Sequence, residues 1–172
     1  DWYVQKAIQE DHAFLLAGHC RYTTSGSTNL RNAHPIQANN VIICHNGTIN
    51  KWDAPRGKEA ETSDSRIFAE KISSLGVKEA CKEAQVGTYA ATFVDTGKKT
   101  LNIVRNAGRT LFTVFSNDND SMLWASEADF LELVLKRNGA RHNWGPVQLV
   151  PPHKHFEWSF YGRAGDGKFT DL

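Results

Sequence analysis

The sequence predicts an α+β domain in which short strands form meanders and helices lie between them. Beyond Gly87, apolar and polar residues alternate over short stretches, and turn residues separate these stretches, as is typical of antiparallel strands. A stretch with helical spacing that begins near Thr62 comes before this alternation, and another that begins near Glu127 interrupts it. The 172 residues contain no internal repeat or long linker, so a single domain over residues 1–172 is expected.

Each element in the first half follows from a local pattern. An apolar stretch over Phe14–Tyr22 and a short apolar run over Val41–His45 are expected to be strands, the second of them buried. Thr62-Ser63-Asp64 is typical of a helix N-cap, and the apolar residues that follow at helical spacing predict a helix through Ile72. A second, shorter helix is expected over Val77–Ala84.

The second half is expected to hold a meander, a helix and a last group of strands. The strands of the meander are predicted at Thr88–Asp95, Thr100–Arg105, Thr110–Phe115 and Ser121–Ala125. An amphipathic helix is expected over Glu127–Arg137, and Asn138-Gly139 is expected to end it. The tail over Pro146–Tyr161 alternates loosely and is expected to give one or two more strands.

Charge and composition exclude several kinds of partner. Twenty basic and nineteen acidic residues leave a formal charge of +1, and the basic residues are scattered, so no nucleic-acid partner is expected. No apolar run approaches the roughly 20 residues that span a bilayer, so no membrane partner is expected either. Three cysteines, an odd and sparse number, favour a reducing compartment and therefore the cytoplasm.

Four short segments place polar groups where packing does not require them. They are Gly18-His19-Cys20-Arg21-Tyr22-Thr23-Thr24-Ser25-Gly26, Asn32-Ala33-His34-Pro35, His45-Asn46-Gly47 and Thr62-Ser63-Asp64-Ser65. In this order and spacing they resemble the class II (N-terminal-nucleophile) glutamine amidotransferases, such as the glutaminase domains of glucosamine-6-phosphate synthase and amidophosphoribosyltransferase. A later segment, Trp124-Ala125-Ser126-Glu127, resembles a strand-to-helix connection of the same family, so the likeness covers most of the chain.

The resemblance implies a fold and an activity. The implied fold is a four-layer αββα sandwich of the N-terminal-nucleophile hydrolase type that lacks its first strand or strands. Val41–His45 is expected to lie centrally in one sheet, and Thr88–Ala125 to supply much of the other. The implied activity is hydrolysis of L-glutamine to glutamate and ammonia, without a cofactor, for an acceptor on a partner protein or domain. The chain resembles the small stand-alone versions of this domain in bacteria and their phages more than it resembles the amino-terminal part of a long synthase.

The resemblance also implies residues that hold the substrate. Free glutamine is a zwitterion, so its pocket needs a cation for the carboxylate and an anion for the ammonium group. Arg21 matches the family's arginine, which can bind a carboxylate with two hydrogen bonds. Asp64 matches the residue that binds the ammonium group, and Thr24 a position that contacts the substrate in a mobile loop. His34 is grouped with these residues and is expected to pin its loop by hydrogen bonds. Read singly, Arg21 also fits a surface salt bridge and Asp64 a helix cap.

Asn46 and Gly47 match the oxyanion hole of the family. The side-chain amide of Asn46 and the backbone N–H of Gly47 are expected to point at the oxygen that gains charge during acyl transfer. Glycine suits this role because it allows close approach and positive φ. The alternative interpretation is an ordinary Asn-Gly hairpin turn.

The nucleophile of the family is not found where the family places it. Class II enzymes use a cysteine as the first residue, because its free α-amine serves as the base. Asp1 stands first here, and we expect the catalytic cysteine on a segment upstream of it. Two alternatives stay open: a non-catalytic binding or assembly module that keeps the fold, and substitution by an internal cysteine such as Cys44.

Histidines raise the question of a metal site. His34, His45, His153 and His155 could in principle serve as ligands. No carboxylate or cysteine accompanies them at ligand spacing, so the sequence predicts no metal.

Overall fold

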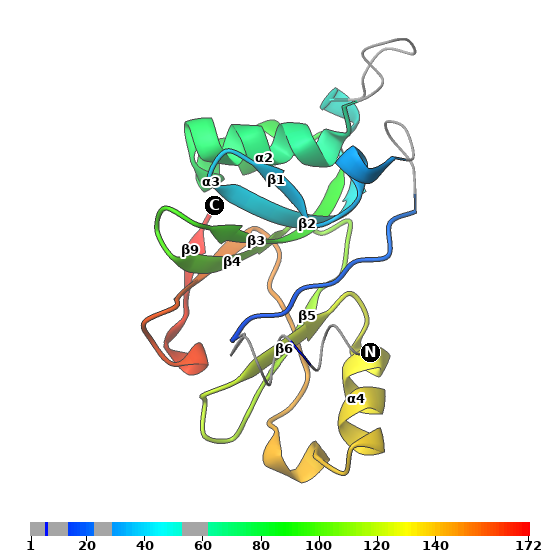
Figure 1. Ribbon diagram of the computed structural model, residues 1–172, viewed down its shortest axis with the longest axis vertical. Helices are drawn as coiled ribbons and strands as arrows, with labels where there is room; N and C mark the ends of the chain where they lie inside the picture. Colours follow the sequence, from blue (N-terminus) through cyan, green and yellow to red (C-terminus); the bar gives the residue numbers. More distant parts are fainter. Residues whose placement is uncertain (1–5, 7–13, 23–28, 53–61) are drawn as a thin grey trace.

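Two antiparallel sheets lie face to face, and each has helices on its outer side (Figure 1). The computed structural model describes residues 6, 14–22, 29–52 and 62–172. The larger sheet runs in the order β1 (Ile36–Ala38), β2 (Val41–Thr48), β3 (Thr88–Asp95), β4 (Thr100–Arg105), β8 (Lys154–Ser159) and β9 (Lys168–Asp171). The smaller sheet runs in the order β6 (Met122–Ala125), β5 (Phe112–Phe115) and β7 (Gln148–Leu149). The helices are α2 (Asp64–Leu75), α3 (Val77–Glu83) and α4 (Ala128–Arg137).

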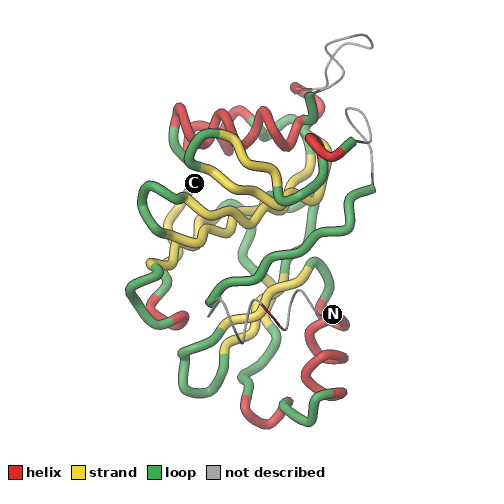
Figure 2. The backbone as a smooth tube through the Cα atoms, viewed as in Figure 1, coloured by secondary structure: helices red, strands yellow, loops and turns green. Residues whose placement is uncertain are grey.

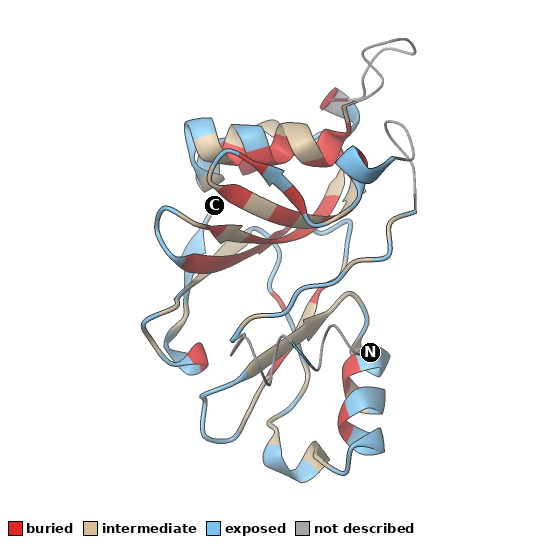
Figure 3. Cartoon of the chain, viewed as in Figure 1, coloured by how far each residue is buried: buried red, intermediate tan, exposed pale blue. Residues whose placement is uncertain are grey.

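Three hydrophobic clusters separate the four layers. Alternation along β3 sends Tyr89 and Phe93 toward α2 and α3, where they pack in one cluster with Phe68. Ala90, one position along, faces the smaller sheet and packs with Ile103 in a second cluster. The third cluster packs α4 against the smaller sheet. The order is therefore helix, sheet, sheet, helix, and Figure 3 shows that buried residues are concentrated in the larger sheet and α2.

Helix ends follow the local chemistry of the sequence. Ser63 caps α2, because its Oγ accepts a hydrogen bond from the backbone N–H of Arg66. Gly76, at φ +83°, separates α2 from α3. Beyond α4, Gly139 turns the chain at φ +62°. The predicted helices at α3 and α4 and most of the predicted strands are confirmed within one or two residues, whereas α2 runs three residues beyond Ile72.

The first strand of the larger sheet covers only part of its neighbour. β1 pairs with β2 from Val41 to Ile43, whereas β3 pairs with β2 along its whole length to Thr48. Among the described residues, the stretch of β2 from Cys44 to Thr48 therefore has no strand on its other side. The candidate functional site lies at this open edge.

Three sequence predictions need correction. Phe14–Tyr22 is not a strand: residues 15–22 run as loop between the two sheets without a ladder partner (Figure 2). Val41–His45 lies in the second strand of six, not at the centre of the sheet. The Thr88–Ala125 meander is divided, since β3 and β4 join the larger sheet and only β5 and β6 join the smaller one. No helix among the described residues is long and apolar enough to cross a membrane.

Candidate functional site

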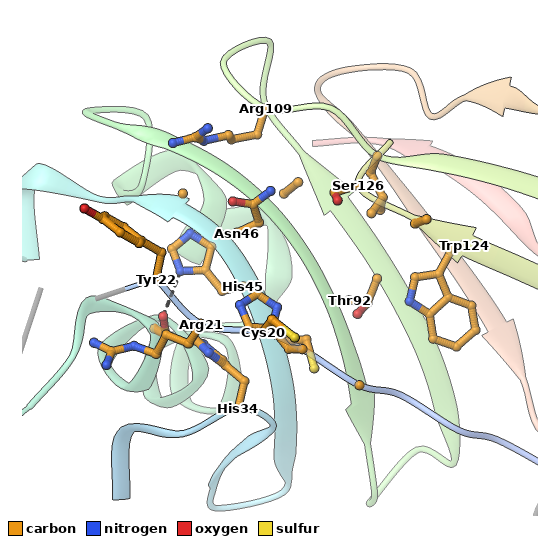
Figure 4. Close-up of a pocket in the computed structure, with 18 of the residues that line it drawn as sticks. Cys20, Arg21, Tyr22, His34, His45, Asn46, Thr92, Arg109, Trp124 and Ser126 are labelled. Atoms are coloured by element: carbon orange, nitrogen blue, oxygen red, sulfur yellow. Dashed lines mark hydrogen bonds between the residues drawn. The ribbon is translucent and has the colours of Figure 1, made fainter. Parts of the chain in front are cut away.

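A cavity of about 640 Å³ opens between the sheets at the open edge of β2 (Figure 4). Five of the six residues predicted from the sequence line it together: Arg21, His34, Asn46, Gly47 and Asp64. The sixth, Thr24, lies outside the described residues. The opposite wall comes from the smaller sheet and its surroundings: Arg109, Leu111, Trp124, Ala125, Ser126 and Phe130. Segments that are far apart in the sequence therefore form one cleft.

The open edge of β2 explains how one strand supplies so many lining residues. Side chains on a strand alternate between its two faces, so His45 points to the helix side, whereas Cys44 and Asn46 point to the other side. All three nevertheless line the cavity. Because β1 pairs only as far as Ile43, the cavity reaches both faces of the strand around its edge.

Asp64 is the first residue of α2 and is held by hydrogen bonds at both carboxylate oxygens. The backbone N–H of Ile49 donates to Oδ2 (2.9 Å), and the backbone N–H of Ser65 donates to Oδ1 (2.8 Å). Burial raises the pKa of Asp64, while these hydrogen bonds and the nearby charge of Arg21 act in the opposite direction. The side chain is therefore a fixed, preoriented acceptor beside Arg21.

His45 is linked to this aspartate through a serine. Its Nδ1 lies 2.9 Å from the hydroxyl of Ser65, and that hydroxyl lies 3.4 Å from Oδ1 of Asp64. Among the described residues, the buried Nε2 atom has no hydrogen bond of good geometry, although the nearby backbone carbonyl of Thr88 acts to raise the pKa of the ring. Burial lowers the pKa of His45 to about 3, so its imidazole is neutral at physiological pH.

The backbone conformation at position 47 requires a glycine, independently of the sequence motif. Its φ is +142°, and a Cβ added there would lie 2.0 Å from the carbonyl oxygen of Thr88 on β3. No other residue fits at this position without movement of the sheet. Asn46, the residue before it, extends its side-chain amide into the cleft (Figure 4).

His34 lines the cleft but does not pin its loop as the sequence suggested. Among the described residues, both ring nitrogens are buried without a hydrogen-bond partner. The ring instead packs against His19, with 4.4 Å between ring centroids. Burial, followed by the charges of neighbouring groups, lowers the pKa of His34 to about 3. The expected hydrogen-bonding role is therefore wrong, and the ring is a neutral packing group.

His155 and Cys44 bear on the metal site and the internal nucleophile that the sequence raised as alternatives. Nε2 of His155 donates to Oδ1 of Asn102 on the larger sheet (2.8 Å), and His155 does not line the cleft. Within the part of the chain that the structure describes, no cluster of three or more histidine, cysteine, aspartate or glutamate side chains is arranged to hold a metal. Cys44 lines the cleft, but burial raises its pKa to about 11, so its thiol stays protonated near neutral pH.

Sequence reasoning missed two residues of the site. Ser65 was quoted only as part of a motif, and its position between His45 and Asp64 depends on how α2 packs on β2. Arg109 lies in a turn of the meander, where an exposed arginine carries no signal of its own. Only the packing of the two sheets brings it to the cleft.

Comparisons with known proteins found relatives among the amidotransferases and aminotransferases. The chain is 32% identical over 143 residues to glutamine–fructose-6-phosphate aminotransferase (isomerizing) of Listeria innocua. This match covers 69% of this chain and 23% of that protein. It is 28% identical over 151 residues to the chloroplastic amidophosphoribosyltransferase of Vigna aconitifolia, covering 77% of this chain and 30% of that protein. No protein-family model matches the chain.

A solved structure shows the same fold. The glutamine phosphoribosylpyrophosphate amidotransferase of B. subtilis, complexed with ADP and GMP, superposes with a TM-score of 0.57 at 20% sequence identity. The match covers 89% of this chain and 34% of that chain. The predicted resemblance to class II glutamine amidotransferases and the predicted αββα sandwich are therefore confirmed. The chain spans only about a quarter to a third of the length of the curated relatives.

Proposed function

We propose that this chain is the glutamine-binding domain of an amidotransferase and hosts the half-reaction that releases ammonia from L-glutamine. The similarity to amidotransferases is the premise, and one observation on this chain supports the proposal. Arg21, Asn46, Gly47 and Asp64, which come from separate parts of the sequence, line one cavity large enough for a small ligand.

In this proposal the two charges of the amino acid meet opposite charges at one end of the cleft. Arg21 binds the α-carboxylate, and its planar guanidinium can donate two parallel hydrogen bonds. Asp64 accepts from the α-ammonium group with the lone pairs that Ile49 and Ser65 leave open. Because both Asp64 oxygens are already anchored to backbone N–H groups, little side-chain entropy is lost when the ligand binds.

The side chain of the amino acid then extends toward Asn46 and Gly47. There the Asn46 amide and the Gly47 N–H stabilise the negative charge that forms on the amide oxygen when a nucleophile attacks. The C–N bond of the amide breaks, ammonia leaves, and water releases glutamate from the resulting acyl intermediate. His45 and Ser65 act as positioning residues, since they link the strand of Asn46 to the carboxylate of Asp64.

The nucleophile in this proposal is a cysteine on a segment upstream of the residues printed here. Cys44 is a poor candidate, because a thiol with a pKa of about 11 supplies very little thiolate at neutral pH. The ammonia acceptor is assigned to a partner protein or domain. An ammonia-release assay on the longer gene product tests this part: release that Cys44→Ala abolishes would overturn the upstream assignment.

Binding of the amino acid can be tested without chemistry. We expect the chain as printed to bind L-glutamine weakly in a calorimetric titration. Arg21→Lys and Asp64→Asn are each expected to weaken binding by about 1–3 kcal/mol, because the first loses the planar fork and the second loses the negative charge. The matched control is Arg137→Lys on α4, an exposed arginine outside the cleft, for which no change is expected.

The outcomes separate the two functions that the sequence left open. Unchanged affinity in both cleft variants would mean that the ligand binds elsewhere and would refute the site. Binding by the chain together with no ammonia release by the longer gene product would favour the non-catalytic binding module.

A further inference from the structure

Arg109 brings a second cationic side chain into the cleft, on the side where Asn46 lies (Figure 4). Its side chain is exposed, and among the described residues its guanidinium makes no hydrogen bond or ion pair. Its charge acts on His45, which shows that it lies close enough to affect groups in the cleft. An exposed arginine without a partner, directed into a cleft, is a group available to bind an anion.

The turn that presents Arg109 is held by buried polar groups. Arg105, which is 4% exposed, donates from Nη1 to the backbone carbonyl of Arg109 (2.7 Å) and from Nε to the carbonyl of Val150. The side chain of Asn106 accepts from the backbone N–H groups of Tyr89 (3.1 Å) and Gly108 (3.0 Å). The backbone of Arg109 is therefore fixed relative to β3 and β4, and only its side chain has freedom to move.

Gly108 brings this turn close to Thr88, the first residue of β3. A Cβ at Gly108 would lie 2.4 Å from Cγ2 of Thr88, so only glycine fits there without a shift. Thr88 in turn pairs with Thr48 at the end of β2, and its carbonyl oxygen is the atom that a Cβ at Gly47 would meet. The turn of Arg109 and the strand of Gly47 thus contact the same residue from two sides.

The charges of the cleft do not balance for glutamine. The described lining residues include two cations, Arg21 and Arg109, and one anion, Asp64. The pKa values of the three lining histidines are all lowered, chiefly by burial, so these rings add no charge near pH 7. Zwitterionic glutamine brings one negative and one positive charge, which leaves one cation unmatched. L-Glutamate brings a second carboxylate, at the far end of its side chain.

We propose that Arg109 is a specificity-determining residue that makes the cleft bind α-amino acids with an acidic side chain more tightly than their amides. This inference rests on the proposed function, because that function places the α-carbon at Arg21 and Asp64 and the side-chain end at Asn46. L-Glutamate, the product of the half-reaction, is then held more tightly than L-glutamine.

Calorimetric titration of the full printed chain with L-glutamate and L-glutamine tests the assignment. We expect about fivefold tighter binding of glutamate, the upper end of what an exposed ion pair contributes. Arg109→Gln should bring the ratio of the two dissociation constants close to one, whereas Arg109→Lys should keep most of the preference. Arg137→Gln, which removes an exposed arginine outside the cleft, should keep it fully. Raising the salt to about 0.5 M should shrink the preference, since salt screens exposed charges.

The possible failures can be told apart. Equal affinity for the two amino acids in the wild type, or a preference that survives Arg109→Gln, would overturn the role of Arg109 and leave the proposed function intact. Binding of neither amino acid would overturn both. Thermal unfolding of Arg109→Gln checks that the exposed substitution leaves the fold in place.

Discussion

Acid should destabilise this domain through His45, whose imidazole is buried in neutral form beside the cleft. Its folded pKa is about 3, below the ordinary value of 6.5, and burial is the main cause. Between these two values the unfolded chain binds a proton at this position and the folded chain does not. The contribution of His45 to the free energy of unfolding must therefore fall as the pH drops from 6.5 toward 3.

The size of this loss of stability follows from the interval between the folded and unfolded pKa values of His45. Each pH unit between the two pKa values changes the free energy of unfolding by about 1.4 kcal/mol. Lowering the pH to about 5 should thus remove about 2 kcal/mol through His45 alone. His34, whose pKa is also lowered to about 3, should add a loss in the same direction.

Urea denaturation followed by tryptophan fluorescence measures this effect, because the chain contains five tryptophans. The wild type and His45→Gln are compared at about pH 7.5 and about pH 5, so that the pH dependence of each is measured against itself. We expect the variant to lose about 2 kcal/mol less than the wild type over this interval. His142→Gln, at an exposed histidine, is the control. If His45→Gln keeps the full pH dependence of the wild type, burial does not hold His45 neutral and the reasoning is wrong.

Three further substitutions test the packing that supports the site. Gly47→Ala should destabilise the fold by about 3 kcal/mol in urea denaturation, because its Cβ would meet the backbone of β3. Gly139→Ala, at a position that faces open space, should cost only about 1 kcal/mol. Similar losses for both variants would argue against the close approach of Gly47 to β3. Ser63→Ala should cost about 1 kcal/mol through loss of the α2 cap, and Ser63→Thr, which keeps a hydroxyl, should retain most of the stability. Leu131→Ala should lower stability by about 2–5 kcal/mol by opening a cavity under α4, a result that an unchanged thermal midpoint would contradict.

The sequence by itself determined the elements whose signal is local. The alternation over Thr88–Asp95 and Thr100–Arg105 predicted both strands with the bounds that the structure has. The capping cluster ending at Asp64 predicted the start of α2 in the same way. These predictions succeed because side-chain periodicity and capping hydrogen bonds involve residues within a few positions of one another. The four polar segments also predicted, through the family resemblance, which residues would share a cleft.

Only the tertiary structure decided what depends on distant partners. Phe14–Tyr22 has an apolar pattern, yet it forms no strand, because a strand needs a paired neighbour and the described residues supply none. The division of the meander between two sheets depends on which strand edges pair, and no local sequence pattern predicts this pairing. The same holds for the hydrogen bonds that join His45, Ser65 and Asp64, and for the arrival of Arg109 at the cleft. Burial and strand pairing are set by the packing of whole layers, so the charge balance of the site emerges only when the two sheets lie face to face.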